Sequence, residues 1–219
     1  TPEEIISYIR CMSDEELDIL KIEEAISVHE RTKVHIELYA RNNNLPVVKP
    51  FILIICRNIE HANRTLKLIE EDLFDGRYAG KVLQIDSSTK KDEEIERLFV
   101  SLESADNQIE IVIHVNMLKE GWDVKNLYTI VPLRAANALL LVEQSIGRGL
   151  RLPYGGKRTG DSDVDTLTVI AHENFDAIIN KAKDQSSILS KCSYVERWRC
   201  CSEQHLQGPL RSLQLLVGS

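Results

Sequence analysis

The sequence lacks an apolar run of the roughly 18 residues that a membrane-spanning helix needs. Its first ten residues, TPEEIISYIR, have neither the basic start nor the apolar middle of a secretion signal. These absences predict a cytoplasmic protein with no membrane partner. The chain also lacks an initial Met, from which we expect a piece of a longer protein.

Cysteine is scarce and irregularly spaced. The five cysteines do not form the framework of a disulfide-stabilised domain, and they favour a reducing compartment. Cys56 ends an apolar run and is predicted to be a small buried side chain. Four possible zinc ligands lie near the carboxyl terminus: Cys192, Cys200, Cys201 and His205. They contain no C-x-x-C pair, and adjacent cysteines seldom bind the same ion. We therefore predict no metal site, with a zinc site as the alternative.

Positive charge is also in deficit, because 27 Lys and Arg stand against 34 Asp and Glu, a formal net charge of -7. Such a balance excludes a domain that binds nucleic acid by bulk attraction alone. Any nucleic-acid site must therefore be local. The hydrophobic fraction of 43% is sufficient for the buried core of a globular domain.

The amino-terminal part, residues 1–49, reads as a charged helical segment that flanks or links a domain. Thr1 and Ser13 each precede a Glu by three residues, which is the pattern of a capping box at a helix start. The second helix is expected to continue to about Tyr39, before three asparagines and two prolines stop it.

From Pro50 onward, short apolar runs alternate with amphipathic segments. Strands are predicted at 51–56, 81–86, 109–115, 128–133 and 166–172, and helices at 58–72, 91–103, 137–150 and 173–184. Continuous apolar runs that alternate with helices indicate an α/β domain with a doubly wound parallel sheet, over residues 50–185. Residues 186–219 show no clear period, so we expect an irregular tail and regard it as a candidate for non-native sequence.

The stretch EQSIGRGLRLP, residues 143–153, carries a polar stripe. At about 100° per residue, Gln144, Arg148 and Arg151 fall on one side of a helix, and Gly147 allows close approach to another surface. Two guanidiniums at this spacing can bind phosphate oxygens. A surface helix with arginines paired to carboxylates is the alternative. The stretch 134–158 is locally basic, with five Lys or Arg against one Glu.

A second stretch, KEGWDV at 119–124, follows a predicted strand. A Gly-aromatic-Asp turn at the carboxyl end of a strand can place the Asp123 carboxylate on a ribose hydroxyl, or beside an arginine that touches phosphate. The alternative is a tight turn in which the Asp caps a helix. Parallel sheets bind ligands at this edge, which makes the turn a candidate site.

The order of the two stretches within 116–155 resembles motifs V and VI of superfamily 2 helicases, in which a Gly-x-Asp turn precedes a Gln-x-x-Gly-Arg-x-x-Arg helix. Three short segments are similar in sequence to the helicase (Res) subunit of type III restriction enzymes: LKEGWDV, PLRAA and GRGLRLP. The spacing from Asn116 to Gly121 also resembles the helicase subunit of bacterial excision repair. The resemblance covers roughly residues 50 to 180 and implies the second, carboxyl-terminal RecA-like domain of such a motor.

By this resemblance, Gln144, Arg148 and Arg151 face ATP in a cleft between two RecA-like domains, with Arg151 as the arginine finger. Gly121, Asp123 and Gly147 would serve the nucleotide. The weaker nucleic-acid candidates are Asn116, Arg57, Ser87 and Ser88. The implied partners are double-stranded DNA, the first RecA-like domain of the same protein and a modification (methyltransferase) subunit.

No G-x-x-x-x-G-K-[ST] phosphate loop and no DEAD-type acidic motif occurs in the chain. We therefore expect the absent first domain to hold ATP and Mg²⁺, and the isolated chain to hydrolyse no ATP. Two other functions stay open. One is another superfamily 2 motor, such as an RNA or repair helicase. The other is a non-catalytic α/β module that binds an anion or a protein.

Overall fold

The structure is a computed structural model that describes residues 13–85, 92–115, 124–133, 154, 158–171, 193–199 and 210–216. Its helices are α2 (Asp14–Asn43), α3 (Ile59–Lys67) and α4 (Asp92–Ser101), with a π-helical turn at Leu68–Asp72 and a 3₁₀ turn at Phe74–Gly76. Its strands are β1 (Phe51–Cys56), β2 (Val82–Ile85), β3 (Ile111–Val115), β4 (Leu127–Pro132), β5 (Thr166–Ala171), β6 (Ser193–Arg199) and β7 (Leu210–Leu216). Each strand and helix predicted within the described residues is present, with ends that differ by a few positions.

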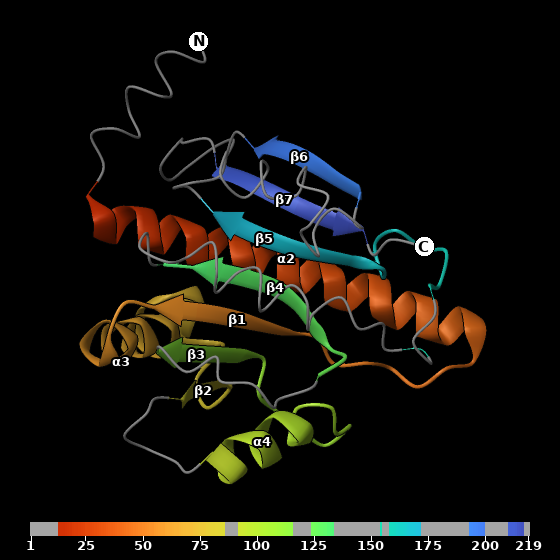
Figure 1. The fold of residues 1–219 in the computed structure, drawn as a ribbon, viewed down its shortest axis with the longest axis horizontal. Coiled ribbons are helices and arrows are strands. Elements are labelled where there is room, and N and C mark those ends of the chain that lie inside the picture. Colours follow the sequence, from red (N-terminus) through yellow and green to blue (C-terminus); the bar gives the residue numbers. More distant parts are fainter. Residues whose placement is uncertain are drawn as a thin grey trace.

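The strands form one sheet in the order β2-β3-β1-β4-β5-β7-β6, which Figure 1 shows from one face. The first five of these are parallel to one another, so the predicted α/β class with a parallel sheet and flanking helices is confirmed. Strands β7 and β6 extend the sheet beyond β5 in antiparallel pairing.

The expectation of an irregular tail after residue 185 does not hold for 193–199 and 210–216, which form β6 and β7. The sequences SYVERWR and LRSLQLL mix polar and apolar residues. They therefore lack the continuous apolar run by which strands buried on both faces are predicted. Antiparallel pairing satisfies their backbone groups without such a run.

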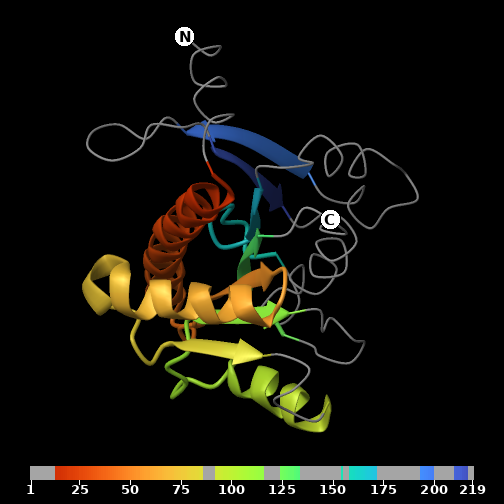
Figure 2. The same cartoon turned by 90° about the vertical axis from the view of Figure 1, so that its left-hand side faces the viewer.

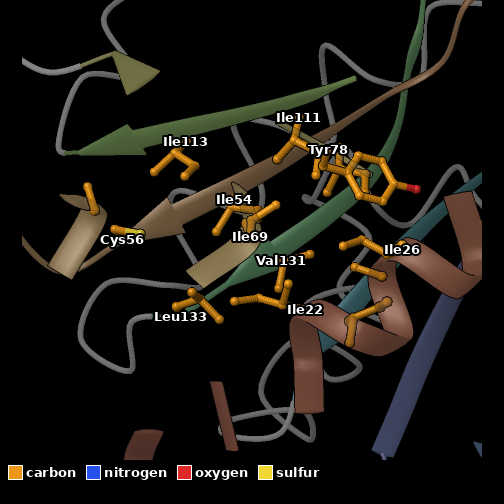
Figure 3. Close-up of a cluster of buried hydrophobic side chains, with 14 of the residues drawn as sticks. Ile22, Ile26, Ile54, Cys56, Ile69, Tyr78, Ile111, Ile113, Val131 and Leu133 are labelled. Atoms are coloured by element: carbon orange, nitrogen blue, oxygen red, sulfur yellow. The ribbon is translucent and has the colours of Figure 1, made fainter. Parts of the chain in front are cut away.

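Strand β1 lies at the centre of the parallel sheet. Ile54 pairs in register with Ile113 of β3 on one side and with Val131 of β4 on the other. All six residues of FILIIC are buried, on both faces of the sheet, as its unbroken apolar run predicts. On one face, side chains of α2 and of the α3 region close a core cluster over β1, β3 and β4 (Figure 3).

Helix α2 begins and ends at clear sequence signals. The Ser13 hydroxyl accepts a hydrogen bond from the Glu16 amide at 3.3 Å, and the Glu16 carboxylate accepts one from the Ser13 amide at 2.8 Å, so the predicted capping box is confirmed. At the other end Asn44 adopts a left-handed conformation with φ 53°. Between these ends, Leu20, Ile26 and Ile36 are buried, which makes α2 part of the core.

The carboxyl ends of the parallel strands share one edge of the sheet, and the first turn of α2 lies at the same edge (Figure 1). Helix α4 lies at the β2 end of the sheet in both views (Figures 1 and 2). None of the helices in the described part of the chain has the length and apolarity that crossing a membrane requires.

Candidate functional site

The chain segments that contain the two predicted motifs follow β3 and β4, which lie on either side of β1 and end at the carboxyl edge of the sheet. Val115, the last residue of β3, pairs with Cys56, and Pro132, the last residue of β4, pairs with Ile55. Neighbouring strands are about 4.8 Å apart, so β3 and β4 end roughly 10 Å from each other. The chain enters 116–123 and 134–150 from these two points.

Most of the predicted site residues lie outside the described residues. They are Asn116, Gly121, Asp123, Gln144, Gly147, Arg148 and Arg151, together with Ser87 and Ser88. The cysteine group at 192–205 also lies outside them. Arg57 is the predicted site residue that the structure describes, and it follows directly after β1.

Arg57 is held by three acceptors. Its Nε donates to the Leu133 carbonyl at 3.0 Å, just after β4. Its Nη1 donates to Asp14 Oδ2 at 3.0 Å and its Nη2 to Asp18 Oδ2 at 3.1 Å. The guanidinium therefore joins the ends of β1 and β4 to the first turns of α2, while the side chain stays 42% exposed.

His61 completes this group from the first turn of α3. The Arg57 amide donates to His61 Nδ1 at 3.3 Å, so the ring proton lies on Nε2, which points at Asp18 Oδ2 at 3.1 Å. Asn58 caps α3 by accepting from the His61 amide at 2.8 Å, which fixes the position of the ring. Asp18 Oδ2 thus accepts from Arg57 and lies close to His61 Nε2.

These side chains line a cavity of about 520 Å³ between the start of α2 and α3. Four carboxylates (Asp14, Glu15, Asp18, Asp72) and three cationic side chains (Arg57, Arg64, Lys67) contribute to its wall. Arg64 lies 3.5 Å from Glu15 in a second, more exposed ion pair. The charged side chains nearly balance, and the apolar side chains of Ile19, Ile22 and Leu68 also line the cavity.

Asp14, Asp18 and His61 were not predicted as site residues. Asp14 is the first residue of α2, directly after the predicted Ser13 cap. A signal was present, because Asp14 and Asp18 are one helical turn apart and lie on one face of α2. Nothing in the sequence links that face to Arg57, which is 39 residues from Asp18.

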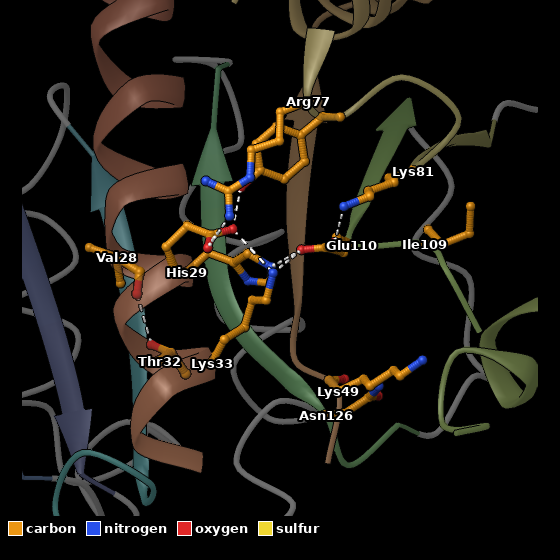
Figure 4. A network of polar contacts seen from close by, with 12 residues as sticks. Val28, His29, Thr32, Lys33, Lys49, Arg77, Lys81, Ile109, Glu110 and Asn126 are labelled. Carbon is orange, nitrogen blue, oxygen red and sulfur yellow. Dashed lines mark hydrogen bonds and ion pairs between the residues drawn. The ribbon is translucent and has the colours of Figure 1, made fainter. Parts of the chain in front are cut away.

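A second polar network lies at the opposite, amino edge of the sheet (Figure 4). Glu110, which precedes β3, accepts from Lys33 at 2.7 Å, from Lys81 at 2.8 Å and from His29 at 3.1 Å. Glu30 accepts from Tyr78 at 2.6 Å and, with its other oxygen, from Arg77 at 2.9 Å. These contacts join α2 to the segments that enter β2 and β3.

The network is an ion-pair cluster, although His29, Glu30 and Glu110 lie close enough together to hold a metal ion. Each oxygen of the two carboxylates already accepts a hydrogen bond from a cationic side chain, a histidine or a tyrosine. Burial alone would raise the pKa of Glu110, but hydrogen bonds from His29, Lys33 and Lys81 lower it well below its usual range. The arrangement stabilises charge already present and leaves little room for an added cation.

Comparison with known proteins supports the predicted resemblance. No family model matches the sequence. Over 44 residues the chain is 52% identical to the HindVIP Res subunit of Haemophilus influenzae, and over 112 residues it is 33% identical to the EcoPI Res subunit of Escherichia phage P1. Both carry the name of type III restriction-modification enzymes. The chain resembles type III Res subunits.

The resemblance is partial on both sides. The two matches cover 20% and 43% of this chain, and they amount to 9% and 11% of the relatives' own lengths. The matched region therefore spans only about a tenth of the length of these relatives.

Solved structures give a weaker likeness. T4 UvsW has a TM-score of 0.36 at 19% identity and covers 68% of this chain and 27% of its own. Domain 2 of the DEAD-box helicase Mss116p, bound to an RNA duplex, has a TM-score of 0.36 at 13% identity, and the match covers 61% of this chain and 47% of that one. The Hef helicase domain of Pyrococcus furiosus has a TM-score of 0.33 at 15% identity, and the match covers 56% of this chain and 22% of that one. At these TM-scores the likeness is too weak to support an argument about function.

Proposed function

We propose that this chain is the carboxyl-terminal, RecA-like motor domain of an ATP-dependent DNA helicase or translocase of the type III restriction kind. The observation that carries the proposal is the origin of both motif segments at one sheet edge, from the two strands that flank β1. Ligands of open α/β sheets bind at this edge. The similarity to Res subunits adds support from sequence.

In this proposal Arg148 and Arg151 bind the phosphates of ATP that is held by the first RecA-like domain of the same protein. ATP supplies the γ-phosphoryl group, and Mg²⁺ bound with it in that domain offsets phosphate charge. The guanidiniums of this chain would neutralise charge as it develops on the transferring group, and Gln144 is predicted on the same side of their helix. Asp123 orients the arginines or binds the sugar, on the turn made by Gly121.

The same edge is proposed to contact the nucleic-acid backbone through Arg57, together with Asn116, Ser87 and Ser88, which follow β3 and β2 in the sequence. Arg57 follows the central strand and is 42% exposed, so a phosphate can reach it. Opening and closing of the cleft between the two RecA-like domains would then change how the backbone is gripped and move the protein along duplex DNA. The remaining proposals are a methyltransferase subunit as partner and the cytoplasm as location.

The experiment measures ATP turnover by the full-length protein that contains this chain, without nucleic acid, with duplex DNA and with RNA. Stimulation by duplex DNA and not by RNA is expected. Stimulation by RNA alone would assign the chain to an RNA helicase, and no turnover under any condition would favour the non-catalytic binding module. The isolated chain, which has no phosphate loop, is expected to hydrolyse no ATP.

A further inference from the structure

Two carboxylates from one helix hold Arg57, and they differ sharply in burial. The Asp18 side chain is 9% exposed, whereas the Asp14 side chain is 68% exposed. Both accept from the same guanidinium, through Nη2 and Nη1 respectively. This asymmetry suggests different roles for two otherwise equivalent contacts.

We propose that Asp18 is a positioning residue that aims Arg57 at nucleic acid, and that Asp14 competes with a backbone phosphate for the same guanidinium. The proposal deepens the nucleic-acid contact proposed above for Arg57 and rests on it. It assigns to the first turns of α2, expected from sequence to be a flanking or linking segment, a direct part in the site.

Asp18 supports Arg57 at two separate points. It accepts directly from the guanidinium, and its Oδ2 lies 3.1 Å from Nε2 of His61, whose Nδ1 accepts from the Arg57 backbone amide. The Leu133 carbonyl fixes the third position, at Nε. Because Asp18 is buried, these contacts lose little to screening by solvent and salt. They hold both the backbone and the side-chain end of Arg57.

Asp14 makes a single contact with Arg57 and makes it in solvent. Exposed ion pairs of this kind are weak and are screened by salt. A phosphate oxygen is a comparable acceptor that can also bind a guanidinium through two N–H groups. Asp14 is therefore the acceptor that an incoming phosphate displaces, while Asp18 and Leu133 keep the guanidinium in place.

The competition has a matched control in the same cavity. Glu15 is the next residue and carries the same charge, but it pairs with Arg64 at 3.5 Å and not with Arg57. Neutralising Glu15 removes the same repulsion of phosphate by charge. Any additional effect of neutralising Asp14 must come from its contact with Arg57.

The test measures binding of a fluorescein-labelled DNA duplex to the full chain by fluorescence anisotropy at fixed salt. Asp14→Asn is expected to tighten binding by about twofold to fivefold, the size of one exposed ion pair, and Glu15→Gln by clearly less. Asp18→Asn is expected to weaken binding by about tenfold, the effect of losing a buried hydrogen bond to a charged group. When Arg57 is already Ala, Asp14→Asn is expected to tighten binding no more than Glu15→Gln does, and Asp18→Asn is expected to leave binding unchanged.

Three results would overturn the proposal: equal effects of Asp14→Asn and Glu15→Gln, a loss in Asp18→Asn that persists in the Arg57→Ala background, or no binding of the duplex by the unaltered chain. Asp14 and Glu15 are exposed, so their variants fold and keep the test valid even if Asp18→Asn does not fold. ATP turnover distinguishes the two failures. If only the roles of Asp14 and Asp18 are wrong, the unaltered full-length protein still hydrolyses ATP. If the motor proposal is wrong, the unaltered full-length protein hydrolyses none.

Discussion

Lys33 Nζ lies 2.7 Å from Glu110 Oε2 and so joins the middle of α2 to the residue that precedes β3. The Glu110 side chain is 17% exposed and also accepts from Lys81 and His29. A single carboxylate therefore fixes a helix of the amino-terminal segment to the entry points of two parallel strands. These contacts therefore connect α2 directly to the sheet.

We predict that Glu110→Gln lowers the free energy of unfolding of the full chain by about 2 kcal/mol, because it leaves partly buried lysines without their anion. Urea denaturation followed by circular dichroism measures this change. Glu37→Gln is the control, since Glu37 is 48% exposed and pairs only with Arg41 among the ion pairs of the described residues. Equal losses in the two variants would contradict the assigned role of Glu110.

The same carboxylate predicts a pH dependence. The folded-state pKa of Glu110 is lowered, so its ionised form stabilises the folded protein above the unfolded-state pKa of about 4.3. That contribution is lost as pH falls below this value toward the lowered folded-state pKa. The difference in stability between the unaltered chain and Glu110→Gln should therefore be full at neutral pH and shrink below about pH 4. A difference that is independent of pH would argue against an ionic contribution.

Cys56 is predicted to be chemically inert in the folded protein. It is fully buried at the end of β1, and burial raises the pKa of its thiol to about 12. At neutral pH, iodoacetamide should label it only as fast as the domain opens, as measured by peptide mass spectrometry. Labelling in denaturant is the control, and rapid labelling of the native chain would contradict the described core.

Asn126 should contribute more to stability than its loop position suggests. It is buried, and its Nδ2 donates to the carbonyls of Lys49 and Leu102, each at 2.8 Å, which joins the approaches to β1 and β4. We predict that Asn126→Ala lowers the free energy of unfolding by about 2 to 3 kcal/mol, because the buried Leu102 carbonyl and the partly buried Lys49 carbonyl lose their donor. Asn43→Ala, which removes an exposed bond to Tyr39, should cost well under half as much. Thermal denaturation compares the two variants.

The sequence predicts the parallel sheet well because continuous apolar runs such as FILIIC occur only where both faces of a strand are covered. It predicts the start of α2 because the Ser13–Glu16 capping box depends on four adjacent residues. Strands β6 and β7 could not be predicted, because their mixed sequences form strands only through pairing with β5 and with each other.

Part of the candidate site could likewise be predicted from the sequence, and part could not. The motif spacing in 116–151 is local and could be read directly from the sequence, and β3 and β4 begin these segments at one edge as expected. The support of Arg57 by Asp14, Asp18 and His61 could not be predicted. It depends on where a long helix crosses the sheet, and the tilt of α2 is set by packing that no local pattern encodes.

The central claim is that this chain supplies an arginine finger to ATP held by another domain. The most direct test is the rate of DNA-stimulated ATP turnover by the full-length protein carrying Arg151→Ala, compared with Arg41→Ala, which alters an exposed arginine paired with Glu37. We predict that Arg151→Ala lowers the rate by about 10³-fold or more while duplex binding is retained, and that Arg41→Ala leaves it unchanged. An unchanged rate in Arg151→Ala would contradict the claim.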